Sequence, residues 1–311
     1  MSGYRRKDLL TYQTRGAAAR PRRRGAGPRV GVIGAGRAGL GLALALRKAH
    51  VSVLGVHGRR DKPVPAGVAL SVGGTAPWLG DADVVLLAVG DDALGALVGD
   101  LLAGGVLRPG QIVLHLSGAQ TSEVLAPLAA LGVVVGSMHP LMTVSAEPER
   151  AAKHFRGAAF ALEGEFEAVR VADGLVRALG GVPVMIPPEA KPLYHAGAVF
   201  ASNYLVTALA AAERLLERAG FPREMAREAL VPLARATLEN VATMGPEASL
   251  TGPIARGDAA TVGRHRAALK PDDRRLYDAL ARATLTLAKA KGLSPAAEAA
   301  LLAALAEGRT P

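Results

Sequence analysis

Cysteine is absent from the 311 residues of this sequence. Its absence excludes disulfides, thiolate nucleophiles and cysteine–zinc sites, and it permits an intracellular location without proving one. Aromatic residues are scarce at 4%, which argues against a binding surface rich in aromatic side chains. No apolar run reaches the roughly 18 residues that a membrane span requires, and the N-terminus has no apolar segment typical of a secretory signal. We therefore expect a cytoplasmic protein without membrane contact.

Several site motifs are also absent. The seven histidines never fall in an H-E-x-x-H or similar pattern, so we expect no metal site. Neither a G-x-S-x-G nucleophile turn nor a Walker A motif occurs. These absences argue against metallohydrolase, serine-hydrolase and P-loop interpretations.

Positive charge is concentrated near the N-terminus. The formal net charge is +10, and residues 1–29 hold nine Lys or Arg and a single acid, Asp8. We interpret residues 1–27 as a solvated, disordered arm or as a leader from a misassigned start codon. A basic arm can also contact nucleic acid or a membrane surface. Because this arm offers few stacking side chains (Tyr4 and Tyr12), we do not expect nucleic acid as the main partner.

The sequence then runs through short apolar segments separated by glycine turns. Seven of these segments predict strands, in or near residues 29–33, 51–58, 84–89, 110–118, 132–140, 157–164 and 181–187. Helical patterns fit between several of them, for instance at 92–102 and 121–131. Apolar strands that alternate with helices predict a parallel sheet covered on both faces.

From about residue 188 the pattern becomes helical. The expected helices span about 190–219, 223–244, 272–291 and 294–308, and Asp258 is expected to cap one more. We therefore predict two domains after the arm, residues 28–188 with the sheet and residues 189–308 with helices alone.

The segment Gly34-Ala35-Gly36-Arg37-Ala38-Gly39 matches the pattern G-x-G-x-x-G. It follows a predicted strand and opens a predicted helix, which is the context that a dinucleotide site requires. Gly34 permits the tight turn, Gly36 lets the backbone approach a pyrophosphate, and Gly39 lets helix and strand pack closely. A plain glycine turn of an α/β protein is the alternative. We predict dinucleotide binding.

The end of the second strand indicates which dinucleotide binds. NAD sites place Asp or Glu there, on the ribose hydroxyl. This sequence has Arg59 and Arg60, whose guanidiniums suit a 2′-phosphate. Asp61 could compete, but we expect it to pair with an arginine. The prediction is NADP(H), with two solvated turn arginines as the alternative.

Ligands of open parallel sheets bind beyond the carboxyl ends of the strands. Small or polar residues stand at these ends: Val89-Gly90 after one strand, Ser117 after the next, and His139 after the fifth. Ser117 is equally explained as a turn or cap residue, and His139 as a packed loop histidine.

These segments resemble a known group. The resemblance to Rossmann-like oxidoreductases with a helical C-terminal domain of the type labelled DUF2520 covers roughly residues 28–300. It rests on RVGVIGAGRAG, GRR, AVGDDAL, VLHLSGAQTSEVLAPL, GSMHPL, KPLYHAGAVFASN and LTGPIARGDAATV.

The resemblance implies an α/β fold, in which a Rossmann-like parallel-sheet domain precedes an all-helical domain similar to that of 6-phosphogluconate dehydrogenase. It relates the chain in plan to β-hydroxyacid dehydrogenases, pyrroline-5-carboxylate reductases and ketopantoate reductases. In these enzymes the sheet domain binds the nicotinamide cofactor, and the helical domain closes a cleft and builds a homodimer. Some members of the DUF2520 type are believed to be alternative ketopantoate reductases, and most have no assigned substrate.

The resemblance also implies roles for single residues. In β-hydroxyacid dehydrogenases the catalytic lysine begins the helix after the sheet, with an asparagine four residues on. Lys191 matches that lysine, but His195 replaces the asparagine, so an orienting or a proton-shuttling role for His195 stays open. Ser117 matches the serine-containing turn near the nicotinamide. The segment with His139 matches the substrate loop, although it lacks the glycine pair of that family.

Helical geometry gives a further argument for a site in residues 191–203. On an α-helix, Lys191, His195 and Ser202 fall within 40° of one another, and Asn203 flanks this stripe. The alternative is a helix whose polar edge faces water. A lysine and a histidine four residues apart lower each other's proton affinity, which suits acid–base catalysis.

The predicted site has three groups of residues. The catalytic residues are Lys191, His195 and Asn203. The substrate-binding residues are Ser117, His139, Ser202 and Arg256, the last as a carboxylate partner that could equally pair with Asp258 or Glu247. The cofactor-binding residues are Gly34, Ala35, Gly36, Arg37, Ala38, Gly39, Arg59, Arg60, Val89, Gly90 and Ser117.

The resulting interpretation is an NADPH-dependent oxidoreductase that transfers hydride to a carbonyl or imine of a small acidic metabolite, with ketopantoate as the most concrete candidate. It would act as a homodimer. The alternatives are an NADP(H)-binding sensor or partner protein without catalysis, and nucleic-acid association through the arm.

Overall fold

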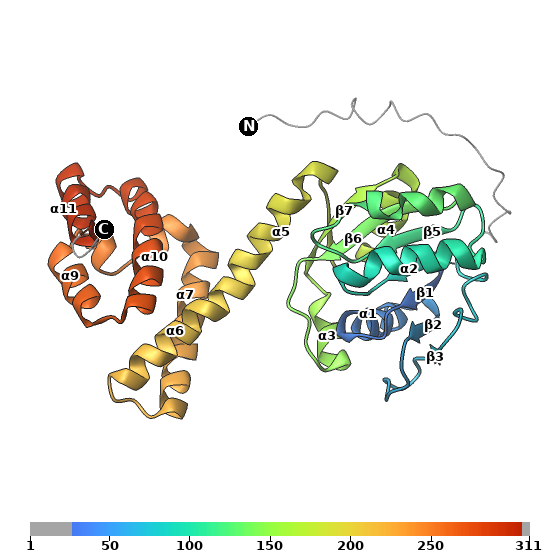
Figure 1. Ribbon diagram of the computed structural model, residues 1–311, viewed down its shortest axis with the longest axis horizontal. Coiled ribbons are helices and arrows are strands. Elements are labelled where there is room, and N and C mark those ends of the chain that lie inside the picture. The colour runs from blue at the N-terminus through green and yellow to red at the C-terminus, as the bar shows by residue number, and fades with distance from the viewer. Residues whose placement is uncertain (1–26, 307–311) are drawn as a thin grey trace. The chain divides into compact units, whose positions relative to one another are not determined.

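The computed structural model describes residues 27–306, so the predicted basic arm lies outside the described residues. The chain divides into two compact units between Asn203 and Tyr204. The first contains the sheet and the second contains helices alone (Figure 1). The strand-to-helix change expected near residue 188 is present, because the last strand ends at Met185 and η2 (Pro188–Ala190) begins the helices. The domain limits predicted from the sequence stay a prediction.

One eight-stranded sheet organises the first unit, in the order β3-β2-β1-β4-β5-β6-β7-β8. Its strands are β1 (Arg29–Ile33), β2 (Ser52–Gly58), β3 (Leu70–Val72), β4 (Val84–Leu87), β5 (Ile112–His115), β6 (Val134–Pro140), β7 (Ala159–Gly164) and β8 (Val182–Met185). The seven predicted strands are all present. The sequence analysis missed β3, which has three residues and is too short to show a period of two.

The sheet is parallel from β3 to β6, and β7 runs antiparallel to β6. The connection through α3 (Pro148–His154) brings the chain back beside the strand that it has just left, so β7 reverses direction. The crossover through α4 (Phe166–Ala178) then places β8 parallel to β7. The prediction of a wholly parallel sheet is therefore wrong for β7 and β8. The prediction of an α/β sheet covered on both faces is confirmed.

Both faces of the sheet are buried, which explains why the strands are continuously apolar. Val32, Leu86 and Leu114 pack on one face with α1 (Arg37–Lys48), α3 and α4. Val85 and Val113 pack on the other face with α2 (Asp91–Gly104) and η1 (Ser122–Leu131). Successive residues of a strand point to opposite faces, so the central strands β1, β4, β5 and β6 contribute to both cores.

The helix expected at 121–131 is η1, a 3₁₀-helix rather than an α-helix. Pro127 lies inside it and has no N–H to donate to a carbonyl of the preceding turn, which opposes regular α-helical hydrogen bonding.

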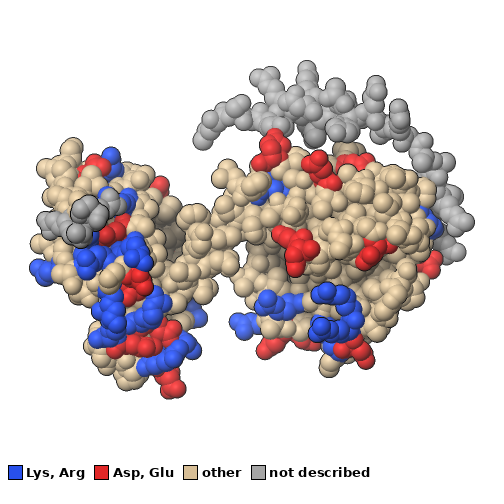
Figure 2. Space-filling view, viewed as in Figure 1, with Lys and Arg blue, Asp and Glu red and all other residues tan. Residues whose placement is uncertain are grey.

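The second unit is built from α6 (Leu205–Arg218), α7 (Arg223–Ser249), α8 (Pro253–Arg256), α9 (Ala259–Ala268), α10 (Pro271–Ala290) and α11 (Pro295–Ala306). Its core packs side chains of α8 to α11, including Ile254, Val262, Leu285 and Leu301. Basic and acidic side chains are interspersed on its surface (Figure 2). Among them, Arg214 and Arg218 both bind Asp273.

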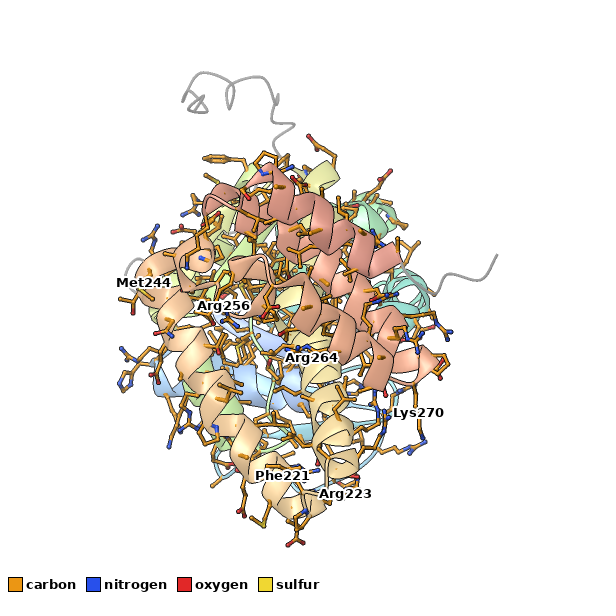
Figure 3. All side chains as sticks on the ribbon, turned by 90° about the vertical axis from the view of Figure 1, so that its left-hand side faces the viewer. Phe221, Arg223, Met244, Arg256, Arg264 and Lys270 are labelled. Atoms are coloured by element: carbon orange, nitrogen blue, oxygen red, sulfur yellow. The ribbon has the colours of Figure 1, made fainter. Side chains whose placement is uncertain are left out.

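The helix ends of this unit can be compared with those predicted from the sequence. Asp258 caps α9 as predicted, because its Oδ1 accepts the Thr261 N–H at 2.9 Å. The stop expected at Gly245 is a kink within α7, where Gly245 adopts φ of 80° and the helix resumes after it. Met244 lies beside this kink, far along α7 from Phe221 at the preceding turn (Figure 3). In the described part of the chain, no helix is long and apolar enough to cross a membrane.

Candidate cofactor and catalytic site

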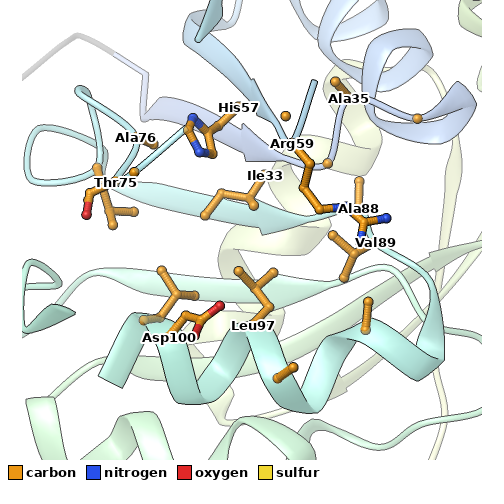
Figure 4. A pocket seen from close by; sticks show the side chains of 18 of the residues that line it. Ile33, Ala35, His57, Arg59, Thr75, Ala76, Ala88, Val89, Leu97 and Asp100 are labelled. Carbon is orange, nitrogen blue, oxygen red and sulfur yellow. The ribbon is translucent and has the colours of Figure 1, made fainter. Parts of the chain in front are cut away.

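A groove of about 850 Å³ opens at the carboxyl ends of β1, β2 and β4. The glycine loop after β1, the turn after β2 and the first turns of α2 line it (Figure 4). Seven of the predicted cofactor residues meet there: Gly34, Ala35, Gly36, Arg59, Arg60, Val89 and Gly90. The remaining four, Arg37, Ala38, Gly39 and Ser117, do not line this groove.

The three glycines of the loop have distinct geometric roles. Gly34 has φ of 114°, and a Cβ there would lie 2.2 Å from the Ala88 carbonyl oxygen. A Cβ on Gly39 would lie 1.8 Å from the Gly34 carbonyl oxygen, so helix and strand pack closely at this point. A Cβ on Gly36 would meet nothing within 4 Å. Gly36 is therefore bare toward open space, as expected where a ligand approaches the backbone.

The start of α1 offers unused backbone donors. Gly36 is its N-cap, no side chain caps the helix, and its first turn holds no acidic residue. The first helical bond runs from the Leu40 N–H to the Gly36 carbonyl oxygen. The N–H groups of Arg37, Ala38 and Gly39 precede it and, with the helix dipole, favour an anion.

Arg59 and Arg60 are exposed at the end of β2, and both line the groove with Lys62. The pairing expected for Asp61 is not found within residues 27–306, where no ion pair joins it to an arginine. The positive charge of Arg59, Arg60 and Lys62 is therefore not neutralised by a carboxylate of the described chain. Three cations at one end of a dinucleotide groove favour a phosphate there.

Lys191 begins α5 (Lys191–Val199) and is fully buried, with 0% of its surface exposed. Its Nζ donates to the Ser117 carbonyl oxygen at 2.9 Å and to Ser137 Oγ, and it lies 3.5 Å from Glu163 Oε1. The three N–H bonds of an ammonium thus all have acceptors. The Lys191 ammonium is therefore enclosed by the turn after β5 and by residues of β6 and β7.

Glu163 completes this buried network. Its carboxylate accepts the Ser122 N–H at 2.8 Å and the Ser122 hydroxyl at 2.7 Å, so both oxygens are bound. Burial lowers the pKa of Lys191, and the Glu163 carboxylate opposes that shift. The pair ties the start of α5 and the start of η1 to the sheet.

Two imidazoles meet at Gly118, next to Ser117. A Cβ at Gly118 would lie 2.5 Å from His195 Nδ1 and 2.8 Å from His139 Nε2. The two rings pack edge to face with centroids 5.9 Å apart. His195 Nδ1 is buried and has no hydrogen-bond partner within the described residues. Two predicted site residues from distant segments are therefore brought together here.

Tyr194 contacts the second ring nitrogen of His139, Nδ1. Its hydroxyl lies 2.8 Å from His139 Nδ1, and the two rings pack edge to face with centroids 5.5 Å apart. Burial raises the pKa of Tyr194 to about 12. Burial, followed by the charges of His195 and Lys191, lowers the pKa of His139 to about 4. Tyr194, which was not among the predicted site residues, thus makes a polar contact with one of them.

The other predicted site residues have different surroundings. The Ser117 hydroxyl accepts the N–H groups of Ala119 and Gln120 at 3.2 and 2.9 Å, which is the turn role considered from the sequence. Ser202 Oγ lies 3.3 Å from Thr143 Oγ1. Arg256 ends α8 in the second unit. Contacts of Ser117, Ser202 and Arg256 with cofactor or substrate stay predictions.

The stripe of polar residues is only partly α-helical. Lys191 and His195 lie on α5, but a π-helical turn, Phe200–Tyr204, interrupts the helix expected over 190–219. Residues of a π turn advance by less than the α-helical 100°. The angles expected for Ser202 and Asn203 are therefore wrong, and Asn203 need not flank the stripe.

Two family models match the chain. One is described as a Rossmann-like domain and covers residues 15–140, and the other as a domain of unknown function (DUF2520) and covers residues 158–284. The two matched segments follow one another in the order expected from the sequence. The DUF2520 match begins within the sheet unit and includes Glu163, Lys191 and His195. Among curated proteins, none matches the sequence.

Solved structures with this fold include BF3122 of Bacteroides fragilis, a candidate NADP oxidoreductase, at 22% identity and a TM-score of 0.68 over 84% of this chain and 98% of that one. TM1727 of Thermotoga maritima is 21% identical, with a TM-score of 0.65 over 84% of this chain and 99% of that one. A Plasmodium falciparum pyrroline carboxylate reductase with NADP bound is 12% identical, with a TM-score of 0.54 over 90% of this chain and 97% of that one. These likenesses support the fold of this chain, a sheet domain followed by helices.

Sequence reasoning missed Glu163 and Ser122 in the buried network. Glu163 did leave a signal, since it is the lone charged residue in the apolar segment GAAFALEG. An acid in a strand that is buried on both faces needs a partner, and Lys191 is that partner. Ser122 left no comparable signal, because serine is common at the start of helices.

Proposed function

We propose that this chain is an NADPH-dependent oxidoreductase that transfers hydride to the carbonyl or imine carbon of a small acidic metabolite. The observation that carries the proposal is the groove with the bare Gly36 backbone at its glycine loop and Arg59 and Arg60 at its rim. This arrangement supports a dinucleotide whose pyrophosphate lies at the start of α1 and whose 2′-phosphate meets the arginines.

Val89, Gly90 and Ser117 would hold the nicotinamide end of NADP(H), which would supply the hydride. The substrate would lie beside Gly118, where His139 and His195 converge. In this proposal His195 and Asn203 meet the substrate, and Lys191 acts from behind the Ser117–Gly118 turn, which its ammonium binds. Its buried positive charge favours the negative charge that develops on the substrate.

The substrate class is proposed from charge. The Lys191 ammonium behind the Ser117–Gly118 turn favours a carboxylate-bearing substrate on this turn. Ketopantoate stays the most concrete candidate that the resemblance supplies.

A substrate panel tests the activity directly. The purified chain is mixed with NADPH and a set of keto acids and cyclic imines, and the loss of NADPH absorbance is followed. Oxidation of NADPH by one member, dependent on His195, supports a reductase. Tight NADPH binding without turnover across the panel supports the alternative, a non-catalytic NADP(H)-binding sensor.

The double substitution Arg59→Ala and Arg60→Ala is expected to raise the KM for NADPH at least about 10-fold, because a phosphate loses bidentate partners. The KM for NADH is expected to change little. Steady-state kinetics with both cofactors measure the effect. Equal changes for NADPH and NADH would contradict the 2′-phosphate assignment.

We also propose a homodimer formed through the helical unit. Large apolar side chains are exposed along α6 and α7, among them Val206, Met225, Leu233, Leu238 and Met244. In this proposal a second copy of the chain covers these side chains. Light scattering on the purified chain should give twice the chain mass. Replacing Leu233 by glutamate should shift it toward one chain.

A further inference from the structure

We propose that Tyr194 is a positioning residue that fixes His139 as a neutral imidazole with its proton on Nε2. That N–H then donates a hydrogen bond to the carbonyl oxygen or imine nitrogen of the substrate beside Gly118. The inference rests on the proposed reductase function and deepens it, because it assigns the group that meets the developing negative charge.

The geometry directs His139 toward the place where Gly118 lacks a side chain. His139 Nε2 lies 2.8 Å from the position of a Cβ on Gly118, and His195 Nδ1 lies 2.5 Å from the same position. The Lys191 ammonium binds the carbonyl oxygen of the preceding residue, Ser117, and so fixes this turn. Both ring nitrogens therefore lie against the Gly118 backbone, and in this proposal the polar substrate atom binds next to His139 Nε2.

The tautomer follows from the partner of Nδ1. The Tyr194 hydroxyl lies 2.8 Å from His139 Nδ1, whereas its distance to the His139 carbonyl oxygen is 3.4 Å. Burial raises the pKa of Tyr194 to about 12, so the phenol keeps its proton. A phenol that donates along the shorter contact requires a lone pair on Nδ1. The proton of neutral His139 is then on Nε2.

Burial and the surrounding charges keep His139 neutral. The titratable groups facing it are Lys191, Tyr194 and His195 of α5, His115 of β5 and Asp91 of α2. Burial is the largest cause that lowers its pKa to about 4, and the positive charges of His195 and Lys191 act in the same direction, against Asp91. At pH 7 His139 therefore donates a hydrogen bond as a neutral ring, as other oxyanion-binding histidines do.

The electron count of the step is simple. Hydride adds to the substrate carbon, and the π pair of the C=O or C=N bond moves to oxygen or nitrogen. The His139 Nε2–H group stabilises that charge and keeps its own proton. The proton that completes the reduction comes from solvent water.

The test is to observe the ring nitrogens of His139 directly. Long-range ¹H–¹⁵N spectra of the ¹⁵N-histidine-labelled full chain distinguish the two neutral tautomers and the imidazolium, and the His139→Gln variant assigns the signals. For the wild-type protein at pH 7 we expect protonated Nε2 and unprotonated Nδ1. For Tyr194→Phe we expect a mixture of tautomers and a titration midpoint at higher pH, because the neutral ring has lost its donor.

A matched pair elsewhere provides the control. Tyr277 Oη lies 3.1 Å from His265 Nδ1, with the same edge-to-face ring packing, in the helical unit. Tyr277→Phe should leave the His139 spectrum and the rate unchanged. With an active substrate, Tyr194→Phe should lower kcat/KM roughly 10-fold and move its acid limb to higher pH, an effect that loss of packing alone does not produce.

Wild-type His139 with its proton on Nδ1, or doubly protonated at pH 7, would overturn the inference even if Tyr194→Phe does not fold. A Tyr194→Phe spectrum identical to wild type would overturn it as well. The spectra need no cofactor, so the two proposals fail separately. An Nε2–H tautomer in a chain that does not bind NADPH contradicts the reductase alone, and an Nδ1–H tautomer in a chain that binds NADPH contradicts the inference alone.

Discussion

Replacing Lys191 by methionine is expected to lower the free energy of unfolding by about 3–5 kcal/mol, because it leaves the Glu163 carboxylate buried without its cation. Both side chains are essentially unexposed, at 0% and 1%. The same variant is expected to lower kcat by roughly 100-fold or more, since the Ser117–Gly118 turn loses the ammonium that binds it. Denaturant unfolding and steady-state kinetics measure the two effects, and NADPH binding should persist.

A double-mutant cycle separates the ion pair from simple packing. Adding Glu163→Gln to Lys191→Met should restore much of the stability, because no unpaired buried charge then remains. The surface pair of Lys289 and Glu298, with nitrogen and oxygen 3.0 Å apart, gives the control. Lys289→Met should cost about 1 kcal/mol or less. A Lys191→Met variant of wild-type stability and rate would remove Lys191 from both roles.

Replacing Gly118 by alanine is expected to abolish most of the activity while the fold remains. The new methyl carbon would lie 2.5 Å from His195 Nδ1 and 2.8 Å from His139 Nε2, so both rings must move. A displacement of about 1 Å at a reacting centre costs on the order of 100-fold in rate. The measurement is kcat at saturating NADPH, together with the Kd for NADPH, which should stay within about 3-fold of wild type because Gly118 does not line the groove.

Gly174→Ala is the matched control for this change. Gly174 lies inside α4, and a Cβ there would meet nothing within 4 Å. Alanine should therefore stabilise the helix by about 0.5–1 kcal/mol and leave the rate unaltered. Retained activity in Gly118→Ala, with the Gly174→Ala control behaving as described, would show that substrate does not bind between the two histidines.

The cofactor groove was largely predictable, because its parts are consecutive in the sequence. A strand, three glycines and a helix form a local unit, and each glycine has the role that its position in the pattern implies. Arg59 and Arg60 were found for the same reason, since they directly follow the second strand. The reversal of β7 was not predicted, because strand polarity depends on how a connection packs rather than on the strand's own residues.

The catalytic cluster was predictable only in part. Lys191 and His195 are four residues apart, so a helix places them on one face. Glu163 lies 28 residues before Lys191, and no local pattern links the two. The π turn also escaped prediction, because its residues have no composition that separates them from the α-helix around it.

The sequence by itself determined the two-part architecture, the glycine loop and the positive charge at the end of β2, because periodicity and turn chemistry act between near neighbours. Only the tertiary structure decided which polar groups of the later segments are buried together. It placed the Lys191 ammonium on the Ser117 carbonyl oxygen, against Glu163, and brought His139 and His195 together at Gly118, with Tyr194 on His139. Burial shifts the pKa values of Lys191, His139 and Tyr194, and it depends on contacts between segments far apart in the sequence.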